Sequence, residues 1–150
     1  MSSAIRTRKN RRFITKDSGG KENGFLVPIY NNNDHFFETG REPKQAYMTT
    51  VRQGCSKGPH LHFIRTGFFT CIKGNVKIVL KAGAGGYEEY FSGEDHEYLS
   101  VEVPTGVAAL IVNIGEEEAL VLNMPNPAWT PEMDDEHSAD FNDYFTKKEN

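Results

Sequence analysis

The sequence has few cysteines and no long apolar segment. Its 150 residues include two cysteines, Cys55 and Cys71, whose spacing does not suggest a zinc site. We therefore expect reduced thiols and a cytoplasmic location. No apolar run approaches the ~20 residues needed to span a bilayer, and no apolar segment follows the N-terminus as it would in a secretory signal. These shortages argue against a secreted or membrane-embedded protein.

The sequence also lacks a strong excess of charge. The net charge is -4, with 37% hydrophobic and 25% charged residues, which is typical of one soluble globular domain. A basic cluster at residues 6–12 could contact phosphate or nucleic acid, but without interleaved aromatic residues a solvated arm is favoured. We expect no nucleic-acid partner. We predict a single domain over residues 1–150, with a polar basic arm at about 1–23 and a mostly irregular tail at about 125–150.

Helical patterns are scarce, since only residues 140–148 could form a short helix. The rest predicts about nine short strands separated by turns, which is typical of an all-β sandwich or barrel. Residues 24–30 are expected to form the first strand, at a sheet edge because of Pro28. The glycine-rich connection at 82–86 lacks the spacing of a phosphate-binding loop.

Two histidines one residue apart lie in the most informative stretch. Side chains in a strand alternate between faces, so His60 and His62 should point the same way. We expect the strand that ends at Lys73 to return beside theirs as a hairpin. The pair could be a solvated face or a polar spot in the core. Alternatively, two imidazoles in an enclosed site could serve as bases or metal ligands.

The spacing around these histidines resembles that of the cupin family. Gly54, the His60-x-His62 pair and Gly74 have the spacing of the first cupin motif. Residues 104–113, beginning Pro-Thr-Gly and ending in Asn113, have the spacing of the second. The resemblance implies an all-β cupin fold, which is a jelly-roll or double-stranded β-helix barrel.

The sequence departs from the metal-binding cupins, which use His, His, Glu and a further His. The Glu position falls at Thr66 or Gly67, and the last His position at Ala109. Because first-row metals usually have three or more protein ligands, we expect no metal and no cofactor. His60 and His62 are then better interpreted as acid–base groups.

A narrower resemblance involves residues 58–63 (Gly-Pro-His-Leu-His-Phe), 68–74 and 126–136. They are similar to the dTDP-4-dehydrorhamnose 3,5-epimerase-like family and its relatives, the dTDP-4-keto-6-deoxyhexose 3,4-ketoisomerases. This resemblance implies an isomerase that acts on a nucleotide-linked 4-keto-6-deoxy sugar in deoxysugar or lipopolysaccharide biosynthesis. By this match His60 takes the position of the catalytic base. Lys57 takes that of an Arg that contacts the sugar nucleotide.

Three departures from this family concern side chains of the site. The catalytic Tyr of the epimerases falls at Asn123, and the Tyr of their tail at Trp129. The His-x-His pair favours the ketoisomerases, with proton transfer along one face, although their usual Lys after the pair is Phe63 here. A homodimer is expected through the edge strand at residues 24–30, by analogy with the epimerases.

The proposed chemistry suits these residue types. A 4-keto group makes the hydrogens on C3 and C5 acidic, and an imidazole with a pKa near ~6.5 is matched to removing one at neutral pH. The enolate needs a nearby donor or cation, which Lys57 or Arg52 could supply. Candidates for binding the diphosphate are Arg41, Arg52, Lys57 and Arg65, and candidates for stacking on the base are Tyr47, Phe68, Phe69 and Trp129.

Two other functions remain open from the sequence. The chain could be a cupin that binds a sugar nucleotide without turnover, which the missing Tyr at Asn123 would favour. It could also be a metal-dependent small-molecule cupin enzyme, which the missing Glu and His ligands oppose.

Overall fold

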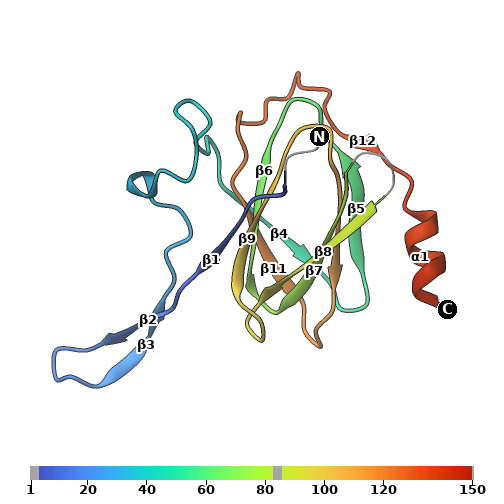
Figure 1. Cartoon of the computed structure of the whole chain (residues 1–150). Coiled ribbons are helices and arrows are strands. Elements are labelled where there is room, and N and C mark those ends of the chain that lie inside the picture. The colour runs from blue at the N-terminus through green and yellow to red at the C-terminus, as the bar shows by residue number, and fades with distance from the viewer. Residues whose placement is uncertain (1–3, 83–85, 150) are drawn as a thin grey trace.

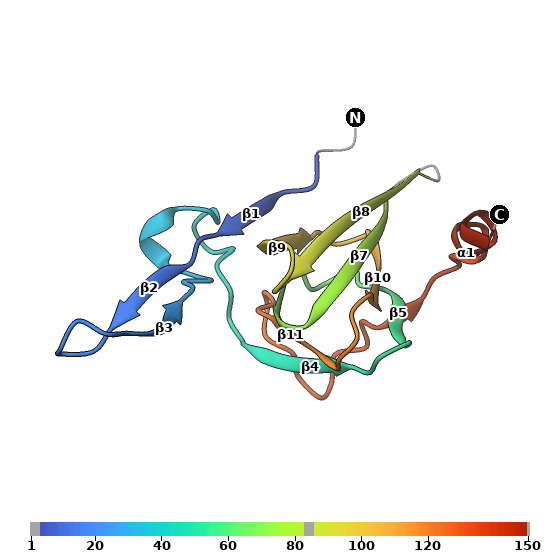
Figure 2. The same ribbon diagram turned by 90° about the horizontal axis from the view of Figure 1, so that it is seen from below.

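The computed structural model of the chain describes residues 4–82 and 86–149. Two five-stranded antiparallel sheets face each other and enclose the core, and a separate two-stranded hairpin extends from them (Figures 1 and 2). The strand orders are β1-β9-β6-β11-β4 and β12-β5-β10-β7-β8. The all-β cupin fold predicted from the sequence is confirmed. Of the glycine-rich connection expected at 82–86, residues 83–85 lie outside the described part.

The described residues form twelve strands, a short 3-10 helix and one α-helix, more strands than the nine expected. The strands are β1 (Thr7–Asn10), β2 (Phe13–Lys16), β3 (Glu22–Leu26), β4 (Tyr47–Val51), β5 (Ser56–Leu61), β6 (Gly67–Lys73), β7 (Asn75–Ala82), β8 (Gly86–Gly93), β9 (Tyr98–Val103), β10 (Ala108–Asn113), β11 (Ala119–Asn123) and β12 (His137–Ser138). The helices are η1 (Asn32–Asp34) and α1 (Asn142–Glu149). No α-helix among the described residues has the length and apolar character needed to cross a bilayer.

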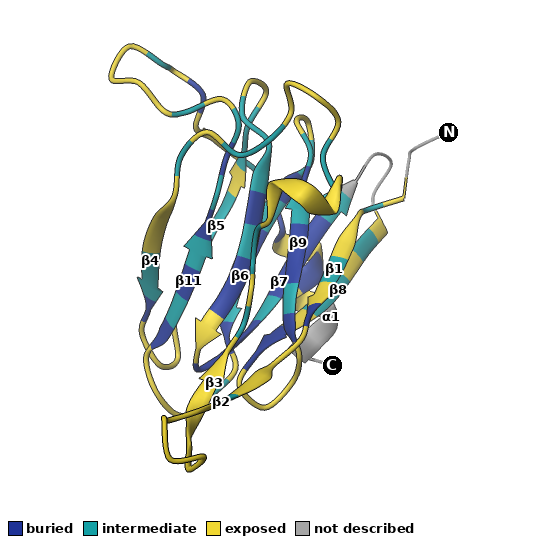
Figure 3. Ribbon diagram, turned by 90° about the vertical axis from the view of Figure 1, so that its left-hand side faces the viewer, coloured by how far each residue is buried: buried dark blue, intermediate teal, exposed yellow. Residues whose placement is uncertain are grey.

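The core lies between the two sheets, where alternate side chains meet. On β7, Val76, Ile78 and Leu80 are fully buried and pack with residues such as Val101 and Val121 from the opposite sheet. Strand alternation explains this set, because positions two apart share one face. Figure 3 shows the buried positions recurring along β7, β9 and β6.

Helix α1 covers part of the outer face of the sheet that contains β7 and β10. Phe141, which precedes the helix, and Tyr144 within it are buried against Val79 and Leu110. These contacts explain why β10 is apolar at successive positions, as expected for a strand buried on both faces.

The prediction that the histidine strand and the strand ending at Lys73 form a hairpin is wrong. β5 pairs with β10 and β12, whereas β6 pairs with β9 and β11 in the other sheet. Residues 62–66 therefore cross from one sheet to the other. Both strands have the alternation that a hairpin requires, but alternation alone does not identify a strand's neighbour.

The N-terminal region contains more strand than the sequence suggested. β1 joins the barrel by pairing with β9, while β2 and β3 pair only with each other and stand away from the barrel (Figure 1). The first strand expected at residues 24–30 is displaced, since β3 ends at Leu26 and Pro28 lies beyond it. Proline cannot donate a ladder hydrogen bond, which is consistent with its position outside the strand. The predicted boundaries of arm and tail remain predictions.

Candidate active site

A cavity of about 270 Å³ opens between the two sheets. It is lined by residues from β4, β5, β6, β9, β10 and β11 and from the C-terminal segment. Both histidines line it, as do five of the predicted substrate-binding residues: Tyr47, Lys57, Arg65, Phe69 and Asn123. The structure thus brings together side chains that are up to 76 positions apart in sequence, such as Tyr47 and Asn123.

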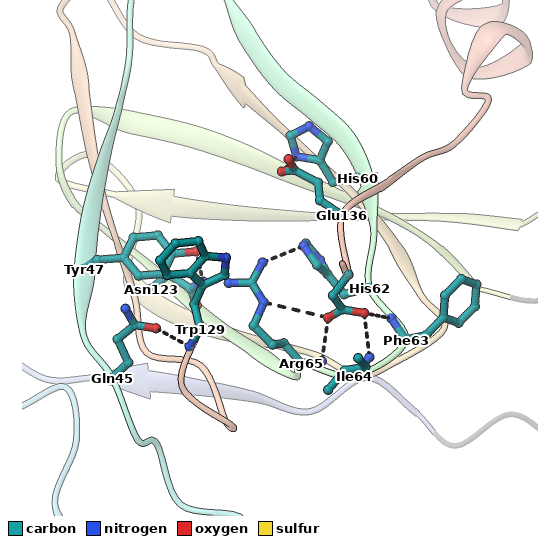
Figure 4. Close-up of polar contacts among 11 residues, drawn as sticks. Gln45, Tyr47, His60, His62, Phe63, Ile64, Arg65, Asn123, Trp129 and Glu136 are labelled. Carbon is teal, nitrogen blue, oxygen red and sulfur yellow. Dashed lines mark hydrogen bonds and ion pairs between the residues drawn. The ribbon is translucent and has the colours of Figure 1, made fainter. Parts of the chain in front are cut away.

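His60 lies near the end of β5, opposite Ala109 of β10 and Ser138 of β12. Its Nδ1 is 3.3 Å from Oε1 of Glu136 (Figure 4). A carboxylate beside Nδ1 favours a proton on that nitrogen and leaves Nε2 as a proton acceptor. Both side chains are about half exposed, so the pair orients the ring more than it stabilises the fold.

Strands β5 and β10 approach each other closely two residues before His60. The β5–β10 register shifts between Ala109 and Ile111, beside Gly58. A Cβ at Gly58 would lie 2.7 Å from the Ala109 carbonyl oxygen, and the residue has a φ of 97°. Only glycine satisfies both conditions without strain, so Gly58 allows the irregularity that precedes His60.

His62 follows β5 and interacts with Arg65 across a tight turn. Nη2 of Arg65 lies 2.9 Å from Nε2 of His62 (Figure 4). Because a guanidinium only donates hydrogen bonds, Nε2 of His62 must accept and its proton resides on Nδ1. Burial, and secondarily the charge of Arg65, lower the pKa of His62 below its usual value. His62 is therefore a poor proton acceptor at Nε2, unlike His60.

The turn after His62 is held by one buried carboxylate, that of Asp135. Its Oδ1 accepts hydrogen bonds from the backbone N–H groups of Phe63 and Ile64, each at 2.8 Å, and its Oδ2 accepts one from Arg65 at 2.9 Å. Burial alone would raise the pKa of Asp135, but these three amides outweigh it and the pKa is lowered. Asp135 is 3% exposed and remains ionised there.

Tyr47 and Asn123 are cross-strand partners on β4 and β11. The Asn123 Oδ1 accepts the Phe68 N–H at 2.9 Å, so its Nδ2 is identified as the donor to Tyr47 Oη, 2.7 Å away. The Tyr47 oxygen therefore accepts this bond, and its own hydrogen is free to be donated into the cavity. The position where the resemblance predicted a tyrosine thus holds an asparagine that orients one on the neighbouring strand.

Other predicted residues lie at or beside the cavity. Lys57 Nζ is 2.6 Å from Thr49 Oγ1, and both residues line the cavity. Trp129 lies in an adjoining cavity of about 310 Å³ that shares Tyr47 and Arg65 with the first, and its backbone N–H donates to the Gln45 side chain at 2.9 Å. Phe68 is instead a core residue, 1% exposed, packed against Phe36 and Phe37.

Two of the predicted cationic residues also lie outside this cavity. Arg41 lines a separate surface depression with Arg6 and Glu102, and Arg52 is exposed beyond the end of β4. Sequence reasoning did not find Asp135 and Glu136. The available signal was a run of acidic residues in the tail, at 134–136, beside a short β-bridge to the histidine strand. Such a run usually lies on a solvated surface, so the pattern alone does not identify a buried carboxylate or a partner of His60.

The metal ligands that many cupins carry are replaced by residues without ligand atoms. Gly67 and Ala109, at two of the positions discussed above, both line the cavity. Among residues 4–82 and 86–149, no group of three or more His, Cys, Asp or Glu side chains is arranged to hold a metal. That the site works without a metal remains a prediction.

Residues 31–137 match the sequence model of the family described as polysaccharide biosynthesis C-terminal domain. The chain belongs to this family. No curated protein matches the sequence significantly.

Solved structures with the same fold include several proteins described as sugar-nucleotide isomerases. A dTDP sugar isomerase from Desulfovibrio desulfuricans G20 aligns with a TM-score of 0.77 and 18% identity, covering 94% of this chain and 87% of that one. QdtA, a sugar 3,4-ketoisomerase from Thermoanaerobacterium thermosaccharolyticum solved with TDP, aligns at 0.67 and 19%, covering 99% and 96%. The capsular polysaccharide assembling protein CapF from Staphylococcus aureus aligns at 0.60 and 21%, covering 67% of this chain and 27% of CapF. The resemblance stated from the sequence is thus confirmed at the level of the fold.

Proposed function

We propose that this protein is an isomerase acting on a nucleotide-diphosphate-linked 4-keto-6-deoxy sugar, in the biosynthesis of a surface polysaccharide. One observation carries the proposal. A base, His60 with its free Nε2, and a proton donor, Tyr47 with its free hydroxyl hydrogen, line one cavity in a fold that dTDP-sugar isomerases share. Isomerisation next to a ketone requires these two functions together.

The first step moves one proton off carbon and another onto oxygen. His60 Nε2 removes the proton from C3 of the sugar, and the electron pair of the C–H bond forms the C3=C4 double bond. The carbonyl oxygen on C4 takes the proton of Tyr47, which gives a neutral enediol. Because the Asn123 amide already donates to Tyr47, the tyrosinate left behind is stabilised.

The second step returns both protons. For ketoisomerisation, the hydroxyl on C3 gives its proton to Tyr47, the double bond shifts, and His60 delivers its proton to C4. No electron acceptor is needed, since oxidation at C3 balances reduction at C4. For epimerisation, a donor on the opposite face adds a proton to C3, the hydroxyl on C4 returns its proton to Tyr47, and His60 releases its proton to solvent. The site supports the shared first step, and the destination of the proton distinguishes the two outcomes.

Arg65 and Lys57 provide positive charge beside the reacting atoms. Arg65 has a largely buried side chain between the two cavities, while His62 accepts its hydrogen bond and keeps it in place. We assign the sugar to the cavity with His60 and the nucleotide to the adjoining one, where Trp129 is half exposed and free to stack. His62 then assists by orienting Arg65, and its onward proton transfer remains a prediction.

Deuterium exchange tests this function directly. Incubated in D₂O with TDP-4-keto-6-deoxyglucose, the protein should replace hydrogen at C3 of the sugar, observed by NMR. Exchange at C3 followed by a 3-keto product identifies a ketoisomerase, and inversion without carbonyl migration identifies an epimerase. Binding without exchange, measured by calorimetry, would show a sugar-nucleotide-binding cupin instead. Activity that requires an added divalent metal and disappears with a chelator would favour a metal-dependent enzyme.

The protein is further proposed to form a homodimer through the β2–β3 hairpin. Phe13 pairs with Leu26 on one face and Ile14 with Phe25 on the other, and these four side chains are 47–58% exposed. A two-stranded hairpin that is apolar on both faces is marginal alone in water. Residues 1–21 hold seven of the 17 Lys and Arg residues and one of the 21 Asp and Glu residues, so the hairpin region complements the acidic remainder of a second copy. A cytoplasmic location also remains a prediction.

A further inference from the structure

Between its two ends, the turn at residues 62–66 is held chiefly by Asp135. The side chains of Phe63 and Ile64 are 60% and 51% exposed, so they do not anchor it by burial. Among the described residues, backbone bonds hold its two ends: the Gly106 N–H donates to the His62 carbonyl oxygen at 2.8 Å, and Thr66 bonds with Asn126. Between these ends, the amides of Phe63, Ile64 and Arg65 all donate to the Asp135 carboxylate. The carboxylate is itself buried and comes from a segment about 70 residues away.

The same carboxylate also balances the charge of Arg65. Nε of Arg65 lies 3.8 Å from Asp135 Oδ2 and has no hydrogen-bond partner among the described residues. The other side of the guanidinium bonds His62, as described above. Asp135 therefore bonds to the backbone of residues 63–65 and also lies beside the guanidinium of Arg65, which fixes the tautomer of His62.

We infer that Asp135 is a positioning residue, whose carboxylate fixes the turn at 62–66 so that Arg65 remains bonded to His62 and directed into the cavity. Three charge-assisted bonds to one rigid acceptor define both the position and the orientation of the turn. Misplacing a charged group by about 1 Å can reduce the rate of an enzyme about 10²-fold. The inference depends on the proposed function only where activity is measured.

Amide hydrogen exchange in the unmodified protein is the first test. The N–H groups of Phe63, Ile64 and Arg65 lie in an exposed turn, yet they should exchange at least about tenfold more slowly than in an unstructured chain, because each is bonded. NMR resolves them individually. Free exchange of all three amides would overturn the inference without any substitution.

The second test compares Asp135→Asn with Asp134→Asn, which changes the exposed neighbouring carboxylate. Asp135→Asn should abolish the slow exchange and reduce kcat about 10²-fold. It should also raise the pKa of His62 towards its ordinary value, because Arg65 moves away. Asp134→Asn should leave all three measurements unchanged.

The direction of the His62 shift separates positioning from simple electrostatics. Besides Arg65, the charged or titratable groups acting on His62 are Asp135, Glu136 and His60. Asp135 by itself raises the pKa of His62, so removing only its charge would lower that pKa. A lowered or unchanged His62 pKa in Asp135→Asn would therefore overturn the inference.

Asp135→Glu provides a second variant in case the asparagine variant does not fold. It keeps the charge but displaces it by one methylene, so a role that needs only the charge predicts normal kcat and a normal His62 pKa. Positioning predicts a loss of kcat and a raised His62 pKa. If the unmodified protein does not exchange substrate hydrogen, the proposed function fails, whereas amide exchange and the His62 pKa still decide the role of Asp135.

Discussion

The N-terminal hairpin and the C-terminal segment at residues 125–138 both reverse the usual distribution of side chains. The hairpin exposes large apolar residues such as Ile14, at 58%, while the C-terminal segment buries a carboxylate, Asp135, at 3%. Exposed apolar surface is unfavourable unless a partner covers it, and a buried charge is unfavourable unless it is bonded. The Phe25 ring lies near Tyr98 of the barrel, yet the large apolar side chains of the hairpin remain about half exposed, whereas Asp135 has three hydrogen-bond donors. The difference supports the proposal that the hairpin serves an association between chains, whereas the C-terminal segment lines this chain's own cavity.

The largest expected effect comes from the residue that the C-terminal segment orients. His60→Asn should reduce kcat about 10²–10⁴-fold, because a positioned general base contributes that much. Glu136→Gln should have a smaller effect in the same direction. Deuterium exchange and turnover with a 4-keto sugar nucleotide measure both. The control is Glu132→Gln, an exposed carboxylate of the same segment, and a loss of activity there equal to that in Glu136→Gln would contradict the pairing.

Stability should distinguish the two regions next. Asp135→Asn should lower the free energy of unfolding by about 2–3 kcal/mol, since hydrogen bonds to a charged group are worth about 1.5–3 kcal/mol each. Ile14→Ser in the hairpin should change it by less than about 0.5 kcal/mol when measured on the monomer, as is usual for exposed sites. Urea unfolding at low protein concentration gives both values. Equal destabilisation by the two variants would contradict the proposed difference between the hairpin and the C-terminal segment.

Association should respond in the opposite order. Phe13→Ser combined with Leu26→Ser, which removes one apolar face of the hairpin, should weaken dimerisation at least ~30-fold, the effect of losing about 2 kcal/mol at an interface centre. Phe145→Ser removes an equally exposed ring from α1 and should leave the dimer intact. Sedimentation velocity measures the dissociation constants. A monomeric unmodified protein at micromolar concentration would refute the assignment of the hairpin.

The cupin fold and the cavity were accessible from the sequence because they depend on local patterns. Alternation on β7 and the two glycine-bounded motifs predict strands, and the spacing of His60 and His62 predicts that they share a cavity. Strand neighbours were less accessible, since the pairing of β5 with β10 rather than β6 is decided by packing across 50 residues of chain. The register of β4 with β11, which places Tyr47 against Asn123, was less accessible for the same reason.

The roles of single polar residues were the least accessible part. Asp135 stands between two other acidic residues, and only the folded structure shows that it alone of the three is buried. Likewise, the proton donor inferred here resides on Tyr47, which the sequence suggested as a stacking residue. These roles follow from hydrogen-bond geometry between distant segments, which no spacing rule encodes.

The smallest expected effect concerns His62 and the dependence of stability on pH. Burial and Arg65 lower the pKa of His62 in the folded protein, so the unfolded chain takes up a proton there first as the pH falls. Between the ordinary pKa of about 6.5 and the lower folded value, the unfolded state binds more protons, and stability therefore decreases with falling pH. His62→Asn should remove this contribution and flatten the profile of unfolding free energy between about pH 7 and pH 5. His96→Asn, which changes an exposed histidine in the turn between β8 and β9, is the matched control. An unchanged slope in His62→Asn would mean that burial and Arg65 do not hold His62 neutral, which would also remove the contrast between the proton-accepting His60 and its neighbour.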